Sequence, residues 1–200
     1  MSGSLLILSG PSGCGKSSLV NEVLKNDDNI YFSISTTTRE PREGEKEGVN
    51  YYYISKEQFK KEIEEGLFLE WAKVHGNYYG TSIKPIEKAL SEGKLVIFDI
   101  DVQGHEIVKK RYNHVMTSLF ITTPNKDILK QRLMGRDTDN LETIEQRLTN
   151  AKSEMDRIDE YDYLLINDDF KLSLSKFEAV VKVARLKNPK NKIDEFSTSW

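Results

Sequence analysis

A glycine-rich turn between an apolar run and a helical segment constrains this chain more than any other feature. Residues 5–8 read Leu-Leu-Ile-Leu, which is typical of a strand buried in a parallel sheet. Residues 10–17 read Gly-Pro-Ser-Gly-Cys-Gly-Lys-Ser and match the pattern G-x-x-x-x-G-K-[ST], and apolar residues then recur at helical spacing up to Lys25. In such a strand–turn–helix unit, backbone N–H groups surround a phosphate at the positive end of the helix. The sequence therefore predicts a nucleoside triphosphate site.

Four side chains in or near this turn have candidate roles. Lys16 would reach the β- and γ-phosphate oxygens, and the Ser17 hydroxyl would hold Mg²⁺. Asp99 ends the apolar run 96–98, where a carboxylate beside the turn suits a magnesium site, although a helix N-cap is the alternative. Cys14 is either a small residue that the turn tolerates or a thiol whose pKa is lowered by the helix N-terminus and Lys16.

The composition excludes several classes of protein. The chain has 200 residues and a formal charge of −3, with one Cys and three His. A single Cys excludes a disulfide framework, and so few His make a catalytic zinc site a poor fit. The acidic balance argues against a nucleic acid polymer as partner, and no apolar run approaches the roughly 18 residues that span a bilayer. Without a signal-peptide pattern at the start, we expect a cytoplasmic protein with no membrane partner.

Short apolar runs alternate with helical patterns along most of the chain. Further buried strands are expected at 95–98, 115–121 and 162–166, and helices at about 83–92, 102–111, 125–134 and 172–187. This alternation predicts an α/β fold with a parallel sheet covered by helices on both faces.

Two segments interrupt the alternation. Residues 30–81 carry Tyr-rich strand patterns around one helix at 56–65, which predicts a small mixed sheet inserted into the core. Residues 136–160 are highly charged with few large apolar side chains, so we expect a mobile rather than a packed segment. The polar residues 188–200 are expected to form a disordered tail.

The arginines are grouped rather than scattered. Five of the eight Arg form two groups in or beside the two interrupting segments: Arg39 and Arg42, and Arg132, Arg136 and Arg147. Guanidinium groups bind phosphate in a bidentate manner, and a spacing of four places Arg132 and Arg136 on one helical face. Two arginine groups around one phosphate loop predict two phosphate-bearing substrates and a closing lid.

A GTPase is the first alternative. Residues 101–104 match D-x-x-G, and 125–127 begin like the guanine-reading N-K-x-D. Ile128 stands where that motif requires its carboxylate, and the D-x-x-G lies far beyond the turn. Both departures argue against a GTPase.

The chain resembles the guanylate kinase family from about residue 4 to 187. The matching stretches are GPSGCGKS, FSISTTTREPREGE, NYYYI, FLEWA, GNYYGT, IFDIDVQG, QRLMGR and INDD. The resemblance implies a three-layer phosphate-loop kinase core (1–33, 82–124 and 158–187), an inserted mixed-sheet GMP-binding domain (34–81) and a helical lid (125–157). It also implies transfer of the γ-phosphoryl group of ATP to GMP with Mg²⁺ as cofactor, and dGMP as a further acceptor. The oligomeric state stays open.

The resemblance implies roles for residues at matching positions. The ATP-binding residues would be Gly10, Pro11, Ser12, Gly13, Cys14, Gly15, Lys16, Ser17, Ser18, Arg132 and Asn167, the last near adenine. The catalytic residues would be Lys16, Arg132, Arg136 and Arg147, and the metal ligands Ser17 and Asp99. The GMP phosphate would contact Arg39, Arg42, Tyr51 and Tyr79, and guanine would contact Ser35, Glu70, Thr81 and Asp101.

The chemistry of guanine supports Glu70 independently. A carboxylate accepts hydrogen bonds from the N1–H and the 2-amino group together, whereas adenine presents an acceptor at N1. A site built on such bonds rejects the wrong base by roughly 10⁴-fold. Leu69 and Trp71 are expected to flank Glu70 as buried neighbours.

Two rivals share the expected fold. A non-catalytic guanylate-kinase-like module would serve as a protein-binding scaffold, but such modules typically lose the phosphate-loop lysine and lid arginines that stand here. A kinase acting on a ribose bisphosphate would not need Ser35, Glu70 or the TTREPR stretch.

Overall fold

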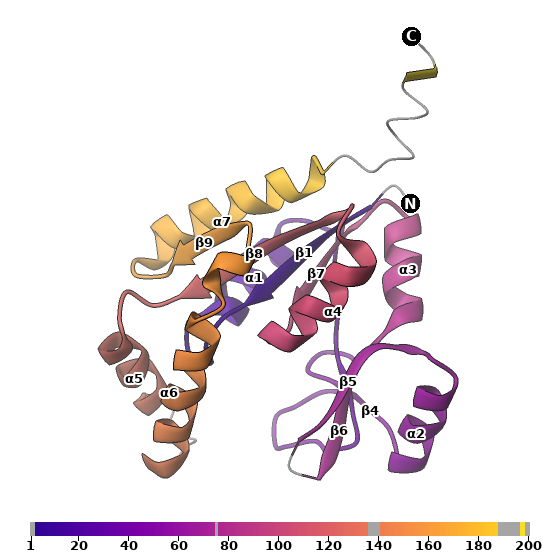
Figure 1. Cartoon of the computed structure of the whole chain (residues 1–200), viewed down its shortest axis with the longest axis horizontal. Helices are drawn as coiled ribbons and strands as arrows, with labels where there is room; N and C mark the ends of the chain where they lie inside the picture. The colour runs from indigo at the N-terminus through magenta and orange to yellow at the C-terminus, as the bar shows by residue number, and fades with distance from the viewer. Residues whose placement is uncertain (1–2, 75, 136–140, 188–196, 199–200) are drawn as a thin grey trace.

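A computed structural model describes residues 3–74, 76–135, 141–187 and 197–198 (Figure 1). Strands and helices alternate along much of the chain, in the order β1 (Ser4–Ser9), α1 (Lys16–Lys25), β2 (Ile30–Phe32), β3 (Thr36–Thr37), β4 (Tyr52–Tyr53), α2 (Lys56–Glu64), β5 (Phe68–Val74), β6 (Asn77–Ser82), α3 (Ile83–Ser91), β7 (Leu95–Asp99), α4 (Val102–Tyr112), β8 (Met116–Thr122), α5 (Lys126–Met134), α6 (Leu141–Met155), the short 3₁₀ helix η1 (Ile158–Glu160), β9 (Tyr163–Ile166) and α7 (Phe170–Arg185). Within this described part, no helix is long and apolar enough to cross a membrane.

The core is a five-stranded parallel sheet in the order β2-β7-β1-β8-β9. Strands β2 and β7 lie on one side of β1, and β8 and β9 lie on the other, so the carboxyl end of β1 lies at the switch in strand order, where open α/β sheets bind ligands. The β1–β7 register pairs Leu8 with Asp99, which places that carboxylate beside the start of the glycine-rich turn. The predicted α/β fold with a parallel sheet is confirmed.

The alternation of side chains along β1 divides the core into two layers. Leu6 and Leu8 pack with apolar residues of α1 and α7 on one face of the sheet. Leu5 and Ile7 pack with residues of α3 and α4 on the other. Because β1 is apolar at both sets of positions, it is buried on both faces, as its sequence predicted.

A second, four-stranded sheet in the order β4-β3-β6-β5 follows β2. It is mixed, because β3 pairs with β4 in parallel and with β6 in antiparallel. Helix α2 packs on it through Phe59, whose ring stacks on Phe68 at a centroid distance of 4.2 Å. Figure 1 shows this sheet and the α5–α6 hairpin as two separate projections from the core toward the same side of the molecule.

The expectation that Trp71 is buried beside Glu70 is wrong. Leu69 is buried, but Trp71 is 47% exposed and lies against Tyr78. An irregularity between Phe68 and Glu70 breaks the strict alternation of β5, so Trp71 no longer shares the buried environment of Leu69.

Two further expectations, on the inserted interval and on the last strand, need correction. The interval 30–81 is not wholly an insertion, because β2 at its start pairs with β7 in the core sheet. The strand expected at 162–166 is an edge strand, with Leu165 buried and Leu164 49% exposed, rather than one buried on both faces. A single-sequence apolar run does not reveal that its strand lies at an edge.

The charged segment 136–160 is packed where the structure describes it. Residues 141–155 form α6, which buries Ile144, Leu148 and Ala151 against Leu129 and Leu133 of α5. Three apolar residues at a spacing of four and three suffice to close a helical hairpin, even though the helix is otherwise polar. The predictions for 136–140 and for most of the tail at 188–200 concern residues outside the described ranges.

Candidate nucleotide site

The glycine-rich turn after β1 has a backbone that its glycines make possible. Gly10 has φ +136°, and a Cβ there would lie 1.9 Å from the carbonyl oxygen of Ile121. Gly15 has φ +99°, and a Cβ there would lie 2.3 Å from Nδ2 of Asn167. Helix α1 begins at Lys16, so the backbone N–H groups of the turn lie at the N-terminus of this helix. The fold thus provides the strand–turn–helix context that the motif requires.

The side chain of Asn167 supports this turn. Its side chain is only 4% exposed, and Nδ2 donates to the carbonyl oxygen of Cys14 at 2.7 Å. Its backbone N–H donates to the carbonyl oxygen of Thr122, at the end of β8. The side-chain amide that the resemblance placed near adenine is therefore engaged in holding the phosphate loop.

Two lid arginines contact the turn. Arg132 on α5 donates to the carbonyl oxygens of Cys14 at 3.5 Å and of Asp168 at 3.3 Å. Arg147 on α6 donates to the Ser12 hydroxyl at 2.6 Å. The third, Arg136, lies outside the described residues, and α5 ends before it at Met134. Two segments distant in sequence thus bring guanidinium groups to the phosphate loop.

Lys16 and Asp99 form an ion pair at the bottom of the site. Nζ of Lys16 donates to the carbonyl oxygen of Gly10 at 2.5 Å and lies 3.6 Å from Oδ1 of Asp99. Burial acts to lower the pKa of Lys16, but Asp99 and other acidic neighbours raise it above its ordinary value, so the ammonium stays charged. Burial raises the pKa of Asp99, and Lys16 opposes that shift. Ser17 lines the same pocket.

The hypothesis that Cys14 has a lowered pKa is wrong. The side chain is fully buried, and burial raises the pKa of the thiol more than Lys16 lowers it. The alternative, a small residue that the turn tolerates, accounts for Cys14.

A second basic group lies in the inserted sheet. Nη2 of Arg39 contacts both carboxylate oxygens of Glu45 at 2.9 Å, and its guanidinium lies 5.4 Å from the ring centroid of Tyr51. The Tyr51 ring in turn packs edge-on against Tyr79, at 6.0 Å. Of the four side chains assigned to the GMP phosphate, Arg39, Tyr51 and Tyr79 therefore form one connected group.

Glu45 organises this group, and the sequence reasoning gave it no role. It accepts hydrogen bonds from the backbone N–H of Arg42 at 2.8 Å and from the Tyr53 hydroxyl at 2.9 Å, besides its pair with Arg39. These bonds, that from Arg42 first, lower the pKa of Glu45 to about 2. The backbone N–H of Glu45 donates to the Arg42 carbonyl oxygen, which closes a turn between the two residues. The signal in the sequence was this carboxylate three residues after Arg42.

The side chains proposed to contact guanine lie on β5, on β6 and just before β3 and α4. Glu70 on β5 pairs with Thr81 on β6, and the Thr81 hydroxyl donates to Oε1 of Glu70 at 2.6 Å. Burial raises the pKa of Glu70, and the negative charge of Asp101 raises it further. The hydrogen bond from the Thr81 hydroxyl opposes this shift. Ser35 precedes β3, and its carbonyl oxygen accepts from the backbone N–H of Tyr52.

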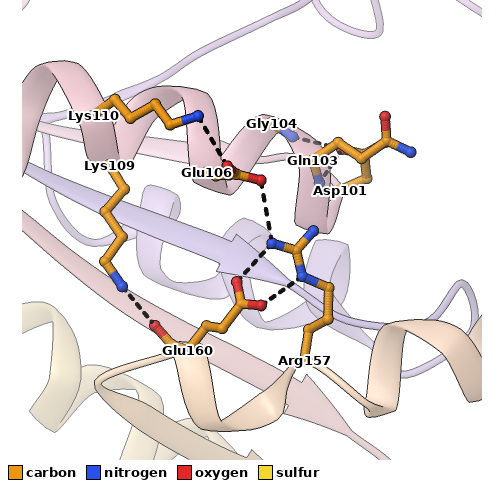
Figure 2. Close-up of polar contacts among 8 residues, drawn as sticks. All are labelled: Asp101, Gln103, Gly104, Glu106, Lys109, Lys110, Arg157 and Glu160. Atoms are coloured by element: carbon orange, nitrogen blue, oxygen red, sulfur yellow. Dashed lines mark hydrogen bonds and ion pairs between the residues drawn. The ribbon is translucent and has the colours of Figure 1, made fainter.

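Asp101 caps helix α4. Its Oδ1 accepts from the backbone N–H groups of Gln103 at 3.0 Å and Gly104 at 2.8 Å, as Figure 2 shows. Asp101 is therefore the N-cap residue of this helix. Both bonds use Oδ1, so capping does not require the second carboxylate oxygen.

Farther along, α4 is tied to the segment that follows the lid (Figure 2). Arg157 pairs with Glu160 through two bonds of 2.7 Å, and its Nη2 lies 3.5 Å from Oε2 of Glu106. Nζ of Lys109 donates to the carbonyl oxygen of Glu160 at 3.2 Å. The chain leaving α6 is thus fastened to the helix that carries Asp101.

The pocket in front of the phosphate loop has a volume of about 310 Å³. Besides the loop itself, its walls include Asp99, Ile100, Asp101 and Glu154. Glu154 comes from α6, close to the carboxyl end of the lid helices, and sequence reasoning did not find it. No motif marks it; its position two turns after Arg147 on one helical face was the only available signal.

This combination of sheet, loop and lid defines a phosphate-loop nucleotide-binding protein with a kinase-like architecture. The comparisons with known proteins are more specific, since the profile of the guanylate kinase family matches residues 2–184. The chain belongs to the guanylate kinase family.

Individual relatives agree with that membership. A guanylate kinase from Sulfurimonas denitrificans is 52% identical over 198 residues, covering 99% of this chain and 96% of the relative. One from Helicobacter pylori is 56% identical over 185 residues, covering 92% and 89%. The crystal structure of guanylate kinase from Anaplasma phagocytophilum matches with a TM-score of 0.75 and 30% identity, over 94% of this chain and 88% of that one.

Proposed function

We propose that this protein transfers the γ-phosphoryl group of ATP to GMP, giving ADP and GDP. The observation that carries the proposal is the occurrence of two distinct binding regions in one chain of this family. One is the phosphate loop with the Lys16–Asp99 pair, and the other is the Glu70–Thr81 pair beside the Arg39 group. A protein that only hydrolysed a nucleotide would not need the second region.

Guanine recognition follows from the Glu70–Thr81 pair. The Thr81 hydroxyl holds Oε1 of Glu70, which fixes the orientation of the carboxylate toward a base. An oriented, ionised carboxylate accepts from guanine N1–H and the 2-amino group, and it repels the N1 lone pair of adenine. Asp101 and Ser35 are proposed to complete the contacts to the base, and dGMP is proposed as a further acceptor.

The GMP phosphate is proposed to bind at the Arg39 group with Arg42, Tyr51 and Tyr79. The bonds to Glu45 hold Arg39 in a defined position before any ligand arrives, which reduces the ordering cost of binding. Phosphate monoesters have a second pKa of about 6 and are mostly dianionic near pH 7. The attacking oxygen is therefore already deprotonated, and the reaction needs no general base.

Lys16, Arg132, Arg136 and Arg147 are proposed to bind the phosphates of ATP and the transferring group. Their positive charges reduce the repulsion between two polyanions, and enclosure by the lid excludes water that would otherwise hydrolyse ATP. The proposed division into a core, a GMP-binding domain at 34–81 and a lid at 125–157 follows from these roles.

Mg²⁺ is the proposed cofactor, with Ser17 and Asp99 to hold it. Both offer oxygen donors, which this ion prefers, and both lie on the wall of the phosphate pocket. The described residues contain no group of three or more His, Cys, Asp or Glu side chains that could hold a metal, which suits an ion bound largely by phosphates and water. When bound, Mg²⁺ neutralises charge on the β- and γ-phosphates.

The proposed setting is the cytoplasm, where a single buried thiol needs no oxidising environment. The two rivals of the same fold are disfavoured by particular side chains. A scaffold module would not need Lys16, Arg132 and Arg147 at the phosphate loop, and a ribose bisphosphate kinase would not need the Glu70–Thr81 pair.

A coupled assay with ATP and Mg²⁺ tests the proposal against GMP, AMP, CMP and UMP as acceptors. The expected result is ADP formation that depends on GMP, with kcat/KM for AMP lower by at least about 10³. Equal rates with AMP and GMP, or no ADP with any acceptor, would overturn it.

A further inference from the structure

The phosphate pocket carries more negative than positive side chains. The charged residues on its wall are one lysine, Lys16, and three carboxylates, Asp99, Asp101 and Glu154. Metal-free ATP carries about four negative charges near neutral pH, because its terminal phosphate ionises with a pKa of about 6. The three carboxylates repel this ligand, whereas Lys16 and the guanidinium groups of Arg132 and Arg147 at the phosphate loop attract it.

Two of the carboxylates have roles that require them. Asp99 lies 3.6 Å from Lys16 and is a proposed metal ligand. Asp101 caps α4 through Gln103 and Gly104 and is proposed to face guanine. Glu154 serves neither purpose. It lines the same pocket as Lys16, Asp99 and Asp101, so its charge lies beside theirs. Burial raises the pKa of Glu154, Lys16 lowers it, and Asp101 and Asp99 raise it.

The packing of the lid fixes Glu154 in this position. Helix α6 is anchored by Ile144, Leu148 and Ala151 against α5, and Arg147 on the adjacent face donates to Ser12 in the phosphate loop. Glu154 follows Arg147 by seven residues, two helical turns, and so points to the same side. The half-buried carboxylate is thus delivered by the lid into the pocket rather than left in solvent.

We propose that Glu154 makes the site discriminate between metal-free ATP and the magnesium complex of ATP. Its negative charge disfavours binding of metal-free ATP more than binding of the magnesium complex. The complex carries about two fewer negative charges, and its cation lies among the same phosphate oxygens. Glu154 acts through its charge and not as a direct ligand, in agreement with the lack of a three-residue metal-binding group among the described residues. The proposal rests on the proposed use of ATP.

The test measures ATP affinity rather than turnover. Calorimetric titration of the full-length protein gives Kd for ATP with excess Mg²⁺ and with a chelator, in the absence of GMP. Glu154→Gln removes the charge and keeps the shape. Glu145→Gln is the matched control, because Glu145 lies on the far face of α6, where it pairs with Lys130 at 2.9 Å.

Glu154→Gln is expected to tighten binding of metal-free ATP by about fivefold, the effect of one partly screened charge at close range. Binding of the magnesium complex should change less, so the ratio of the two Kd values falls, and the difference should shrink at high ionic strength. Glu145→Gln should keep the wild-type ratio. An unchanged ratio in Glu154→Gln, or a ratio changed equally in Glu145→Gln, would overturn the inference. Absence of ATP binding by the wild-type protein with Mg²⁺ would instead overturn the proposed function.

Discussion

Glu70→Gln isolates the step on which base recognition depends. In the structure, Oε1 of Glu70 already accepts from Thr81 at 2.6 Å, and the remaining lone pairs are available to guanine. The substitution keeps the size of the side chain but replaces an acceptor oxygen with an NH₂ group. That group would face a guanine donor instead of accepting from it.

The magnitude follows from the two bonds at stake. A hydrogen bond to a charged group contributes about 1.5–3 kcal/mol, and a buried guanine donor left facing the NH₂ group costs about 1–3 kcal/mol more, so the substitution corresponds to about 3–6 kcal/mol. At about 1.4 kcal/mol for each factor of ten, kcat/KM for GMP should fall by about 10²–10⁴. AMP makes neither bond, so its already low kcat/KM should change by less than about threefold.

The assay compares kcat/KM for GMP, IMP and AMP with saturating ATP. IMP retains N1–H but lacks the 2-amino group, so the substitution should cost it about half the free energy that it costs GMP. Thr81→Ser is the control, since it keeps the hydroxyl that orients Glu70. A Glu70→Gln enzyme within threefold of wild type on GMP would refute the reasoning.

The pH dependence of GMP binding provides a second test of the proposed role of Glu70. Burial raises the pKa of this carboxyl, so it takes up a proton at a higher pH than an ordinary Glu. The protonated form cannot accept both guanine bonds, so KM for GMP should rise as the pH falls toward this raised pKa. Glu70→Gln should lack the part of that rise that comes from Glu70 and keep the part that comes from protonation of the GMP phosphate, whose second pKa is about 6.

Three other changes probe the phosphate side. Lys16→Ala should mainly abolish kcat, whereas Arg39→Ala should mainly raise KM for GMP; near-wild-type kinetics in either variant would contradict the assignments. Gly15→Ala forces a Cβ to within 2.3 Å of Nδ2 of Asn167 at φ +99°, so about 1–3 kcal/mol of stability should be lost, with a Tm lower by several degrees in calorimetry and weaker ATP binding. The Cys14 thiol should react with iodoacetamide far more slowly at pH 7.5 than a free thiol, because it is buried and its pKa is raised; rapid alkylation of the folded protein would show that the loop is more open than described.

The core of the fold could be predicted because its signals are local. The apolar runs at β1 and β7 and the glycine-rich turn each define a backbone conformation without reference to the rest of the chain. Parallel pairing of β1 with β7 then brings Asp99 beside the end of β1. The position of this carboxylate at the end of an apolar run indicated that placement.

The errors arose where the environment depends on distant residues. Trp71 is exposed because an irregularity in β5 shifts the alternation, and Leu164 is exposed because no strand pairs beyond β9 in the described sheet. Helix α6 is packed although its sequence is highly charged, because only one narrow face needs apolar side chains.

The functional residues that sequence reasoning missed act through tertiary contacts. Glu45 matters because the chain folds back to place Arg39 and Tyr53 on its carboxylate, and Glu154 because α6 returns toward the phosphate loop. Asn167 was placed near adenine, and only the fold shows its amide beneath Cys14. The spacings of Glu45 from Arg42 and of Glu154 from Arg147 are too common in sequences to identify such roles, which become visible only in the tertiary structure.

The central claim is that one site pairs ATP with a guanine nucleotide. The most direct measurement gives the protein limiting γ-labelled ATP, Mg²⁺ and an equimolar mixture of GMP, IMP and AMP, and follows the label by chromatography. The account predicts that the label appears in GDP, with far less in IDP and almost none in ADP. Label distributed equally among the three diphosphates, or released as inorganic phosphate, would contradict it.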